Sequence, residues 1–397
     1  MFATDVVIVA GARTPMSRYT GAFSDVSAIE LAAVASREAI RRSGADPQEF
    51  DHAIFGNVMQ TSSDALYGAR HVALRSGLRT ETAAVTVNRL CGSGIEAIAQ
   101  AAQRLLLGES QLVLAGGMEN MTQAPFVIRG LRHGLKLGGG ALEDSLMAGL
   151  TDSYCGLPMA LTAEKLAEQY GIKRKDADAY ALRSQQAAEA AYQACRIKEE
   201  LVPVEVKQGR KTVVVSEDDH RRPDTTMEIL AKLPPAFKKD GIVTAGNASG
   251  IVDGAAAVVV TKQQTAKERG LQPIGRIVSW ATTGVDPSIM GIGPVPSSQK
   301  ALEAAGLTLQ QIDRVEVNEA FAPQYLAVEK ALGLDRDRTN VNGGAIALGH
   351  PLAASGTRLV ITLLNELRRN GLRYGLATAC IGGGQGIAMI VENVAKA

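Results

Sequence analysis

Asn88-Arg89-Leu90-Cys91-Gly92-Ser93-Gly94 is the stretch around which this chain is organised. The apolar run before it, Ala83 to Val87, is typical of a buried strand. The alanine-rich pattern after it, Ile95 to Leu107, predicts a helix that ends at Gly108. Cys91 is therefore expected on a strand-to-helix turn, where the positive end of the helix favours a thiolate over a thiol. Such a cysteine is a candidate nucleophile, although a free cysteine is more often a buried apolar residue.

The composition indicates a globular protein of more than one domain. The chain has 397 residues, 46% of them hydrophobic and 4% aromatic, and its net charge is +1 without a long block of like charge. This charge distribution argues against a protein that binds nucleic acid or a membrane surface. The chain runs directly into an apolar strand pattern, Val6 to Ala10, and holds no apolar stretch long enough to cross a bilayer. We therefore expect a cytoplasmic protein.

Four cysteines occur, at positions 91, 155, 195 and 380. They are too few and too scattered for a disulfide framework. No pair of cysteines or histidines has the spacing of a structural zinc site, so no metal is expected. Cys155 and Cys195 receive no predicted role.

The third section of the chain repeats the first. Residues 306–317 echo residues 44–55, with the same spacing from glycine to aspartate, Gly306 to Asp313 and Gly44 to Asp51. The strand pattern at 375–379 likewise echoes that at 112–115. An internal duplication predicts an α/β fold with two similar, largely parallel sheets and helices packed around them. The expected halves are 1–120, completed by 247–270, and 271–397. The residue composition of 121–246 differs from that of the two halves, and this segment is expected to be an insertion.

Three more stretches are predicted to end strands of this duplicated core: Val317 to Phe321, Gly349-His350-Pro351 and Cys380 to Gly384. Ligands of open α/β sheets bind at the carboxyl ends of the strands. Together with Cys91 these stretches supply two thiols, an imidazole, an amide and a glycine-rich turn. Each residue alone has an ordinary structural explanation, but their joint placement favours one active site.

A rival motif is present within the first stretch. Gly92-x-Gly94-x-x-Ala97 fits the dinucleotide-binding pattern between a strand and a helix. The acidic residue that such a site needs would have to be Glu119, which lies behind two further glycines. A glycine-rich turn after the first strand of the chain is also missing, so dinucleotide binding is disfavoured.

From end to end the chain resembles the thiolase family, most of all the mitochondrial-type 3-ketoacyl-CoA thiolases and their bacterial relatives. The motifs that carry this resemblance are 88–94, Gly246-Asn-Ala-Ser-Gly250, Asn318-Glu-Ala-Phe-Ala322, Gly349-His-Pro351 and Cys380-Ile-Gly-Gly-Gly-Gln-Gly386. The resemblance implies a duplicated five-layer αβαβα core with mixed sheets, in which 121–246 is a loop domain covering coenzyme A. It also implies reversible Claisen chemistry on CoA thioesters in fatty-acid metabolism, no cofactor besides CoA as substrate, and a homotetramer.

The resemblance also assigns roles to residues. Cys91 would carry the acyl group with help from His350, and Cys380, as a thiol near its ordinary pKa of about 8.5, would exchange the proton of the acetyl carbon. His350 with a water held by Asn318 would stabilise the enolate, and the N–H groups of Cys91 and Gly382 the tetrahedral intermediate. The candidates for binding CoA and substrate are Arg222, Ser249, Phe321, Met159 and Phe237.

Two departures from the family pattern bear on function. Ala353 stands where the family usually has glycine, and it would strain the loop beside His350 if that position needs a positive φ. Leu157-Pro158-Met159 replaces a His-Met pair of short-chain members, which favours longer straight-chain 3-ketoacyl substrates. The alternatives that stay open are a short-chain-only acetyl-CoA acetyltransferase, a ketoacyl-synthase-type condensing enzyme and a non-catalytic acyl-CoA-binding protein.

Overall fold

Strand β1 (Val6–Arg13) shows how the core is covered on both faces. Val7 and Val9 point into one apolar cluster, whereas Val6 and Ile8 point into another. This alternation follows from the two-residue repeat of a strand, and a continuous apolar run therefore fits a strand between two layers of helices. The computed structural model describes residues 4–394, and all statements of structure below refer to these.

The first half of the core contains five strands of a mixed sheet. Their order is β1, β12, β5, β3, β4. Strand β3 is parallel to both β4 and β5, and β12 is antiparallel to β5 and β1. The bounds are β3 His52–Gly56, β4 Ala83–Val87, β5 Leu112–Glu119 and β12 Val252–Lys262, and the short β2 (Ser17–Arg18) pairs with β12.

The second half repeats this arrangement in the order β13, β16, β15, β14. Strand β14 is parallel to β15, and β16 is antiparallel to β15 and β13. A short antiparallel contact of Val7 and Ile8 with Arg276 and Gly275 joins the two halves through β1 and β13. The bounds are β13 Gly275–Gly284, β14 Arg314–Val317, β15 Tyr374–Ile381 and β16 Gln385–Glu392.

The duplication extends to single hydrogen bonds. An oxygen of Asp51 accepts the backbone N–H of Gln111 at 2.7 Å, and an oxygen of Asp313 accepts that of Arg373 at 2.9 Å, at the matching place in the second half. The predicted repeat is therefore found in the structure. The expected parallel character is correct only for β3–β4–β5 and β14–β15, because β12 and β16 return antiparallel.

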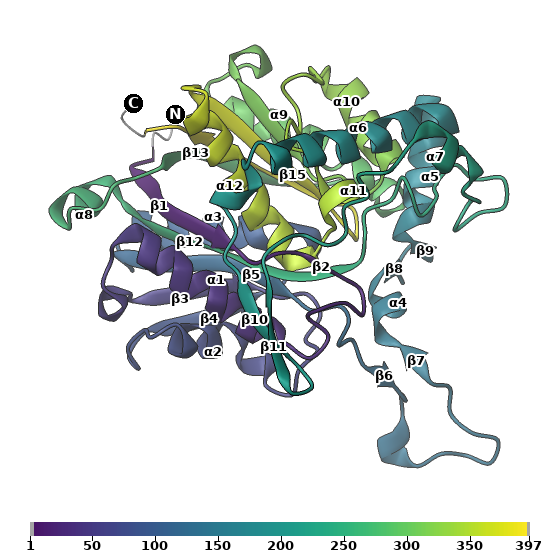
Figure 1. Cartoon of the computed structure of the whole chain (residues 1–397), viewed down its shortest axis with the longest axis horizontal. Helices are drawn as coiled ribbons and strands as arrows, with labels where there is room; N and C mark the ends of the chain where they lie inside the picture. The colour runs from purple at the N-terminus through teal and green to yellow at the C-terminus, as the bar shows by residue number, and fades with distance from the viewer. Residues whose placement is uncertain (1–3, 395–397) are drawn as a thin grey trace.

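Helices form three layers around and between the two halves of the sheet, which gives the predicted five-layer αβαβα order (Figure 1). Helices α1 and α2 cover the outer face of the first half, and α9 and α10 lie outside the second. Helices α3 and α12 pack against each other between the halves. The bounds are α1 Ala28–Ser43, α2 Gly68–Arg75, α3 Ser93–Leu106, α9 Pro294–Ala305, α10 Ala322–Leu332 and α12 Leu352–Arg369; the short α8 is Gln263–Glu268 and α11 is Ala345–Leu348.

The segment between β5 and β12 leaves the core and returns to it. Its first part forms an arm that projects from the body (Figure 1), and α5 and α6 pack beside α10. Its elements are β6 Phe126–Val127, β7 Glu143–Asp144, α4 Ser145–Gly149, β8 Thr151–Asp152, β9 Leu157–Pro158, α5 Met159–Tyr170, α6 Arg174–Gln193, β10 Val204–Gln208, β11 Lys211–Val215 and α7 Met227–Lys232. The limits 121–246 of a loop domain stay a prediction.

A buried ionic cluster connects this segment to the core. Arg13, at the end of β1, has no solvent exposure and makes two hydrogen bonds to Asp218, of 2.7 and 2.8 Å. Its Nε donates to Glu200 at 2.8 Å, and Tyr192 donates to Asp218. The bidentate geometry and the additional donors compensate the cost of burying these charges.

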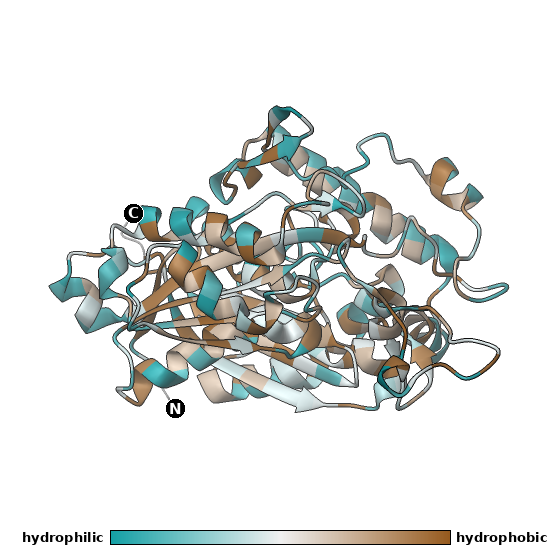
Figure 2. Ribbon diagram, turned by 90° about the horizontal axis from the view of Figure 1, so that it is seen from below, coloured by the Kyte–Doolittle hydropathy of each residue, from teal (hydrophilic) through white to brown (hydrophobic). Residues whose placement is uncertain are grey.

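Apolar residues are concentrated in the strands and on the helix faces that touch them, and the outer helix faces are polar (Figure 2). Strand β4 is an exception, because it lies at the sheet edge and its side chains are only half buried. The prediction of a buried strand at 83–87 is therefore wrong. Within residues 4–394 no helix is long and apolar enough to span a membrane, and no group of His, Cys, Asp and Glu side chains is arranged to hold a metal ion.

Candidate active site

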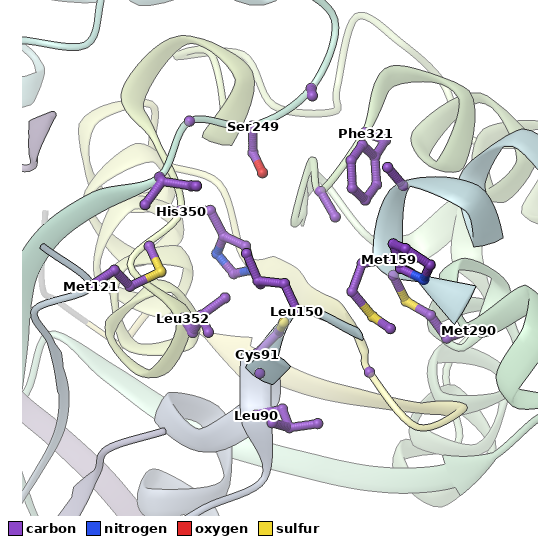
Figure 3. Close-up of a pocket in the computed structure, with 18 of the residues that line it drawn as sticks. Leu90, Cys91, Met121, Leu150, Met159, Ser249, Met290, Phe321, His350 and Leu352 are labelled. Carbon is purple, nitrogen blue, oxygen red and sulfur yellow. The ribbon is translucent and has the colours of Figure 1, made fainter. Parts of the chain in front are cut away.

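Cys91 lies on the turn that the sequence predicts, between β4 and α3. A single 3-10 turn, Leu90–Gly92, separates the strand from the helix. Leu90 has a φ of 46°, a left-handed conformation that is uncommon for a residue with a side chain. Asn88 stabilises the turn, since its side-chain oxygen accepts the N–H of Leu90 at 3.0 Å. The turn places the Cys91 sulfur at the base of a pocket (Figure 3).

The ionisation state of Cys91 differs from the prediction. Burial raises the pKa of its thiol from 9.0 to about 11, against the backbone N–H groups of Gly382 and Cys91, which lower it through hydrogen bonds. Desolvation disfavours the charged form and here outweighs the donors. The thiolate expected from the helix N-terminus alone is therefore not the resting form of Cys91.

His350 faces the same pocket from the opposite half of the core (Figure 3). It follows α11 and precedes α12, so the prediction that it ends a strand is wrong. Its backbone N–H donates to Gly250 O at 2.9 Å, and its Nδ1 lies 2.5 Å from Ser355 Oγ. Ser355 itself donates to Pro351 O at 3.1 Å, so its oxygen is left to accept the proton of Nδ1.

This hydrogen-bond chain leaves His350 Nε2 without a proton and directed toward the site. Burial and the charge of Arg358 lower the pKa of His350 to about 3, so the imidazole is neutral at physiological pH. A neutral imidazole with an unprotonated Nε2 can accept a proton from a thiol. Cys91 and His350 thus form a neutral acid–base pair at rest.

Asn318 and Cys380 complete the group. Asn318 follows β14, and its Nδ2 lies 3.3 Å from His350 Nε2. Its Oδ1 is buried without a hydrogen-bond partner among the described residues. Cys380 lies near the end of β15 and is fully buried. Burial, reinforced by the charge of Cys91 close by, raises the pKa of Cys380 well above its ordinary value, so the predicted value near 8.5 is wrong.

The pocket between these residues has mainly apolar walls (Figure 3). Of the predicted substrate-binding residues, it contains Ser249, Phe321, Met159 and Phe237, and Gly382 lies beside Cys91. Arg222 does not line the pocket and its side chain is exposed. Sequence reasoning missed several pocket residues, for which no motif gives a signal: Met121, Met147, Leu150, Met290 and Leu352.

The motifs and the geometry agree with known proteins. The chain matches the N-terminal domain of thiolase over residues 6–264 and the C-terminal domain of thiolase over residues 271–393. The chain belongs to the thiolase family. It is 53% identical to the mitochondrial 3-ketoacyl-CoA thiolase of Bos taurus, and 46% identical to an acetyl-CoA acetyltransferase of Syntrophomonas wolfei, with 98% of this chain covered in both cases and 98% and 99% of the relatives.

Solved thiolase structures superpose closely on this one. The human mitochondrial 3-ketoacyl-CoA thiolase in complex with CoA has a TM-score of 0.96 and 52% identity, with 98% of each chain covered. The acetyl-CoA acetyltransferase of Bacillus anthracis has a TM-score of 0.97 and 44% identity, with 99% of each chain covered. The predicted thiolase fold and family are therefore confirmed.

The structure also settles one departure from the thiolase pattern. Ala353 lies in the first turn of α12, a right-handed helix, and is not among the residues with positive φ. Alanine is a good helix former, so no strain arises beside His350 at this position. The tripeptide Leu157-Pro158-Met159 forms β9 and the start of α5, and its last two residues line the pocket.

Proposed function

We propose that this protein catalyses the thiolytic cleavage of 3-ketoacyl-CoA by CoA, and the reverse Claisen condensation. The observation that supports this best is that Cys91 and a neutral His350 line one apolar pocket, with the Asn318 amide within hydrogen-bond distance of His350 and the buried Cys380 close to Cys91. Two thiols suit a reaction in which one sulfur carries an acyl group while the other moves a proton. The family and its named relatives agree with this chemistry.

Cleavage begins at Cys91. His350 Nε2 accepts the thiol proton as the sulfur attacks the 3-keto carbon of the substrate. The bond between the second and third carbons then breaks, which leaves an acyl group on Cys91 and the enolate of acetyl-CoA. Cys380 gives its proton to the enolate carbon, and acetyl-CoA leaves.

The second half restores both thiols. The thiolate of Cys380 takes the proton of an incoming CoA thiol, and the CoA sulfur attacks the acyl group on Cys91. As the acyl-CoA departs, protonated His350 returns its proton to the Cys91 sulfur. The raised pKa of Cys380 suits its role in the condensation direction. There the Cys380 thiolate removes a proton from carbon, and a more basic thiolate is the stronger acceptor for that proton.

Two sites are placed to stabilise negative oxygen atoms. The N–H groups of Gly382 and Cys91 lie at the Cys91 sulfur, where the oxygen of a tetrahedral intermediate develops. His350, once protonated, donates from Nε2, and the unpaired Oδ1 of Asn318 can hold a water beside it. Preorganised donors of this kind contribute about 3 kcal/mol each to lowering the barrier.

We infer that the apolar pocket accepts straight-chain substrates longer than four carbons. Pro158 offers no N–H donor for a short polar substrate end, and Met159 provides flexible apolar surface. Each buried CH₂ contributes up to about 0.8 kcal/mol. Ser249, Phe321 and Phe237 line the same pocket and are proposed to contact the CoA thioester, whereas exposed Arg222 is proposed to meet the charged end of CoA outside it.

We further propose a homotetramer. Half-buried β4 presents an open edge, and the projecting arm exposes Phe126, Leu131, Leu137 and Leu142. Exposed apolar groups of this extent are typical of surfaces that a second copy covers. Multi-angle light scattering on the purified chain measures the mass directly, and a monomer or a dimer would contradict this proposal.

The cytosol is our proposed location. All four cysteines are free, which fits a reducing compartment. Several relatives are named as mitochondrial proteins, whereas others are bacterial. Fractionation of cells that make the protein would decide between the two.

The test of the function is an assay of CoA-dependent acetoacetyl-CoA cleavage with the wild-type chain and a Cys91→Ala variant. We expect turnover by the wild type, an acetyl group on Cys91 in peptide maps, and loss of both in the variant. A protein that binds acyl-CoA without turnover would be a non-catalytic binder. A ketoacyl-synthase-type enzyme is disfavoured, because Cys380 stands where a second histidine is needed, and of the described residues lining the pocket His350 is the only histidine.

A further inference from the structure

Glu119 is a buried carboxylate beside the active site that the mechanism above does not use. It ends β5, has no solvent exposure, and accepts four hydrogen bonds. One oxygen accepts from Asn57 Nδ2 at 3.1 Å and from Met59 N–H at 2.9 Å. The other accepts from Val58 N–H at 3.2 Å and from Ala353 N–H at 3.1 Å.

These four donors belong to both halves of the core. Asn57, Val58 and Met59 follow β3 in the first half, whereas Ala353 is the second residue of α12 in the second half. The positive end of α12 adds a favourable interaction with a negative group at this point. Glu119 therefore connects the halves at the place where Cys91 and His350 meet.

The carbonyl oxygen of Ala353 is also closely surrounded by backbone. A Cβ on Gly117 would lie 1.9 Å from the carbonyl oxygen of Ala353, and a Cβ on Gly94 would lie 2.8 Å from it. Only glycine permits such close approach of backbone. Gly94 lies three residues after Cys91, and Ala353 lies three residues after His350. The start of α12 is thus fixed to β5 and to the start of α3.

We propose that Glu119 is a positioning residue that holds His350 at the correct place relative to Cys91. This inference rests on the proposed thiolase reaction and adds a role that the catalytic motifs do not contain. The two reacting side chains come from different halves of a duplicated core, so their separation depends on the junction between the halves. A misplacement of about 1 Å costs about 100-fold in rate.

The junction requires a carboxylate. Burial raises the pKa of Glu119 to about 8, although the N–H groups of Met59, Ala353 and Val58 oppose that rise, so the carboxylate holds the junction most fully above about pH 8. All four partners are donors, so a proton or an amide NH₂ at this position would face N–H groups. Glutamine keeps the shape but turns one acceptor into a donor, which would push α12 away from β5. Aspartate keeps the acceptors but lacks reach.

The charge of Glu119 also raises the pKa of Cys91. Removing that charge makes the Cys91 thiolate more accessible to an alkylating reagent. Loss of the hydrogen bonds that Glu119 makes to both halves of the core slows turnover, because His350 is no longer held at the correct place relative to Cys91. Loss of Glu119 therefore has opposite effects on alkylation and on turnover, whereas general damage to the fold would slow both.

The experiment compares the wild type with Glu119→Gln, Glu119→Asp and the control Asp313→Asn. Asp313 also accepts two backbone N–H groups, from Arg373 and Tyr374 at 2.9 Å each, but at the far end of the strands. We measure kcat and KM for acetoacetyl-CoA cleavage, and the rate at which iodoacetamide alkylates Cys91. Thermal unfolding reports whether each variant folds.

For Glu119→Gln we expect kcat about 10- to 100-fold lower, KM for CoA within about twofold, and Cys91 alkylation as fast as in the wild type or faster. Glu119→Asp should recover part of kcat, and Asp313→Asn should stay within about twofold of the wild type. An unchanged kcat in Glu119→Gln, or alkylation that falls in parallel with kcat, overturns the positioning role. If Glu119→Gln does not fold, Glu119→Asp decides by the same two measurements. A wild type without thiolysis would refute the proposed function instead.

Discussion

The protonation state of the resting site gives the sharpest prediction. Burial raises the pKa of Cys91 to about 11 and lowers that of His350 to about 3, so the pair is thiol and imidazole at neutral pH. A thiolate–imidazolium pair, as in other enzymes that use Cys and His, would react with alkylating agents even in mild acid. The perturbation is therefore pH itself, applied to the free enzyme.

The pKa shift of Cys91 sets the size of the expected effect on the amount of thiolate. A pKa of about 11 in place of 9.0 makes the thiolate ~100-fold rarer at any pH below both values, which corresponds to about 2.7 kcal/mol. Cys91 is only partly buried and lines the pocket. Water in the pocket screens the charge, so ~100-fold is an upper bound.

The assay follows alkylation of Cys91 by iodoacetamide from pH 4 to 11, using mass spectrometry of the peptide that contains it. Cys195 is exposed and would consume reagent, so the measurement uses a Cys195→Ser background. The rate should rise about tenfold per pH unit without levelling below pH 9. A His350→Asn variant should keep this profile, because the shift arises from burial, while losing acyl transfer.

An inflection near pH 8.5 would show that Cys91 is solvated like a free cysteine. A plateau that begins between pH 5 and 7 and disappears in His350→Asn would show a resting ion pair. The first result refutes the raised pKa of Cys91, although the thiol would still dominate at neutral pH, and the second refutes the neutral pair and shows that His350 generates the thiolate.

Three other outcomes are expected. Cys380→Ser should still acylate Cys91 from acetyl-CoA but lose most condensation, since a hydroxyl is a poor acid and base near neutral pH; full condensation would place the proton transfer elsewhere. The kcat/KM for a medium-chain 3-ketoacyl-CoA should equal or exceed that for acetoacetyl-CoA, because Pro158 and Met159 give the pocket an apolar wall, and a collapse beyond four carbons would instead identify a short-chain acetyltransferase. Asp218→Asn should lower the free energy of unfolding in urea by about 3–5 kcal/mol, because Arg13 would stay buried without its bidentate partner. Although burial opposes it, Arg13 holds the pKa of Asp218 below its ordinary value, so this stability should be complete above about pH 4 and disappear as the pH falls further; an unchanged urea midpoint would exclude a stabilising role.

The local pattern of the chain determined its elements and its repeat. The apolar run of β1 and the alanine-rich helix pattern of α3 depend on neighbours a few positions away, and both were readable from sequence. The equal spacing from glycine to aspartate at 44–51 and 306–313 predicted the duplication, which the matching hydrogen bonds of Asp51 and Asp313 confirm. The position of Cys91 on a turn was predictable for the same local reason.

What depends on distant contacts was decided only by the tertiary structure. The antiparallel return of β12 and β16, the exposed edge of β4 and the exclusion of Arg222 from the pocket follow from packing between segments far apart in the chain. The ionisation of Cys91 and Cys380 also follows from packing between distant segments. The cost of burying a charge is set by all the groups around it and not by the motif that contains it. Glu119 shows this most clearly: the sequence offered it only as the acidic residue of a disfavoured nucleotide motif, and only the fold brings it to the amide of Ala353, 234 residues away.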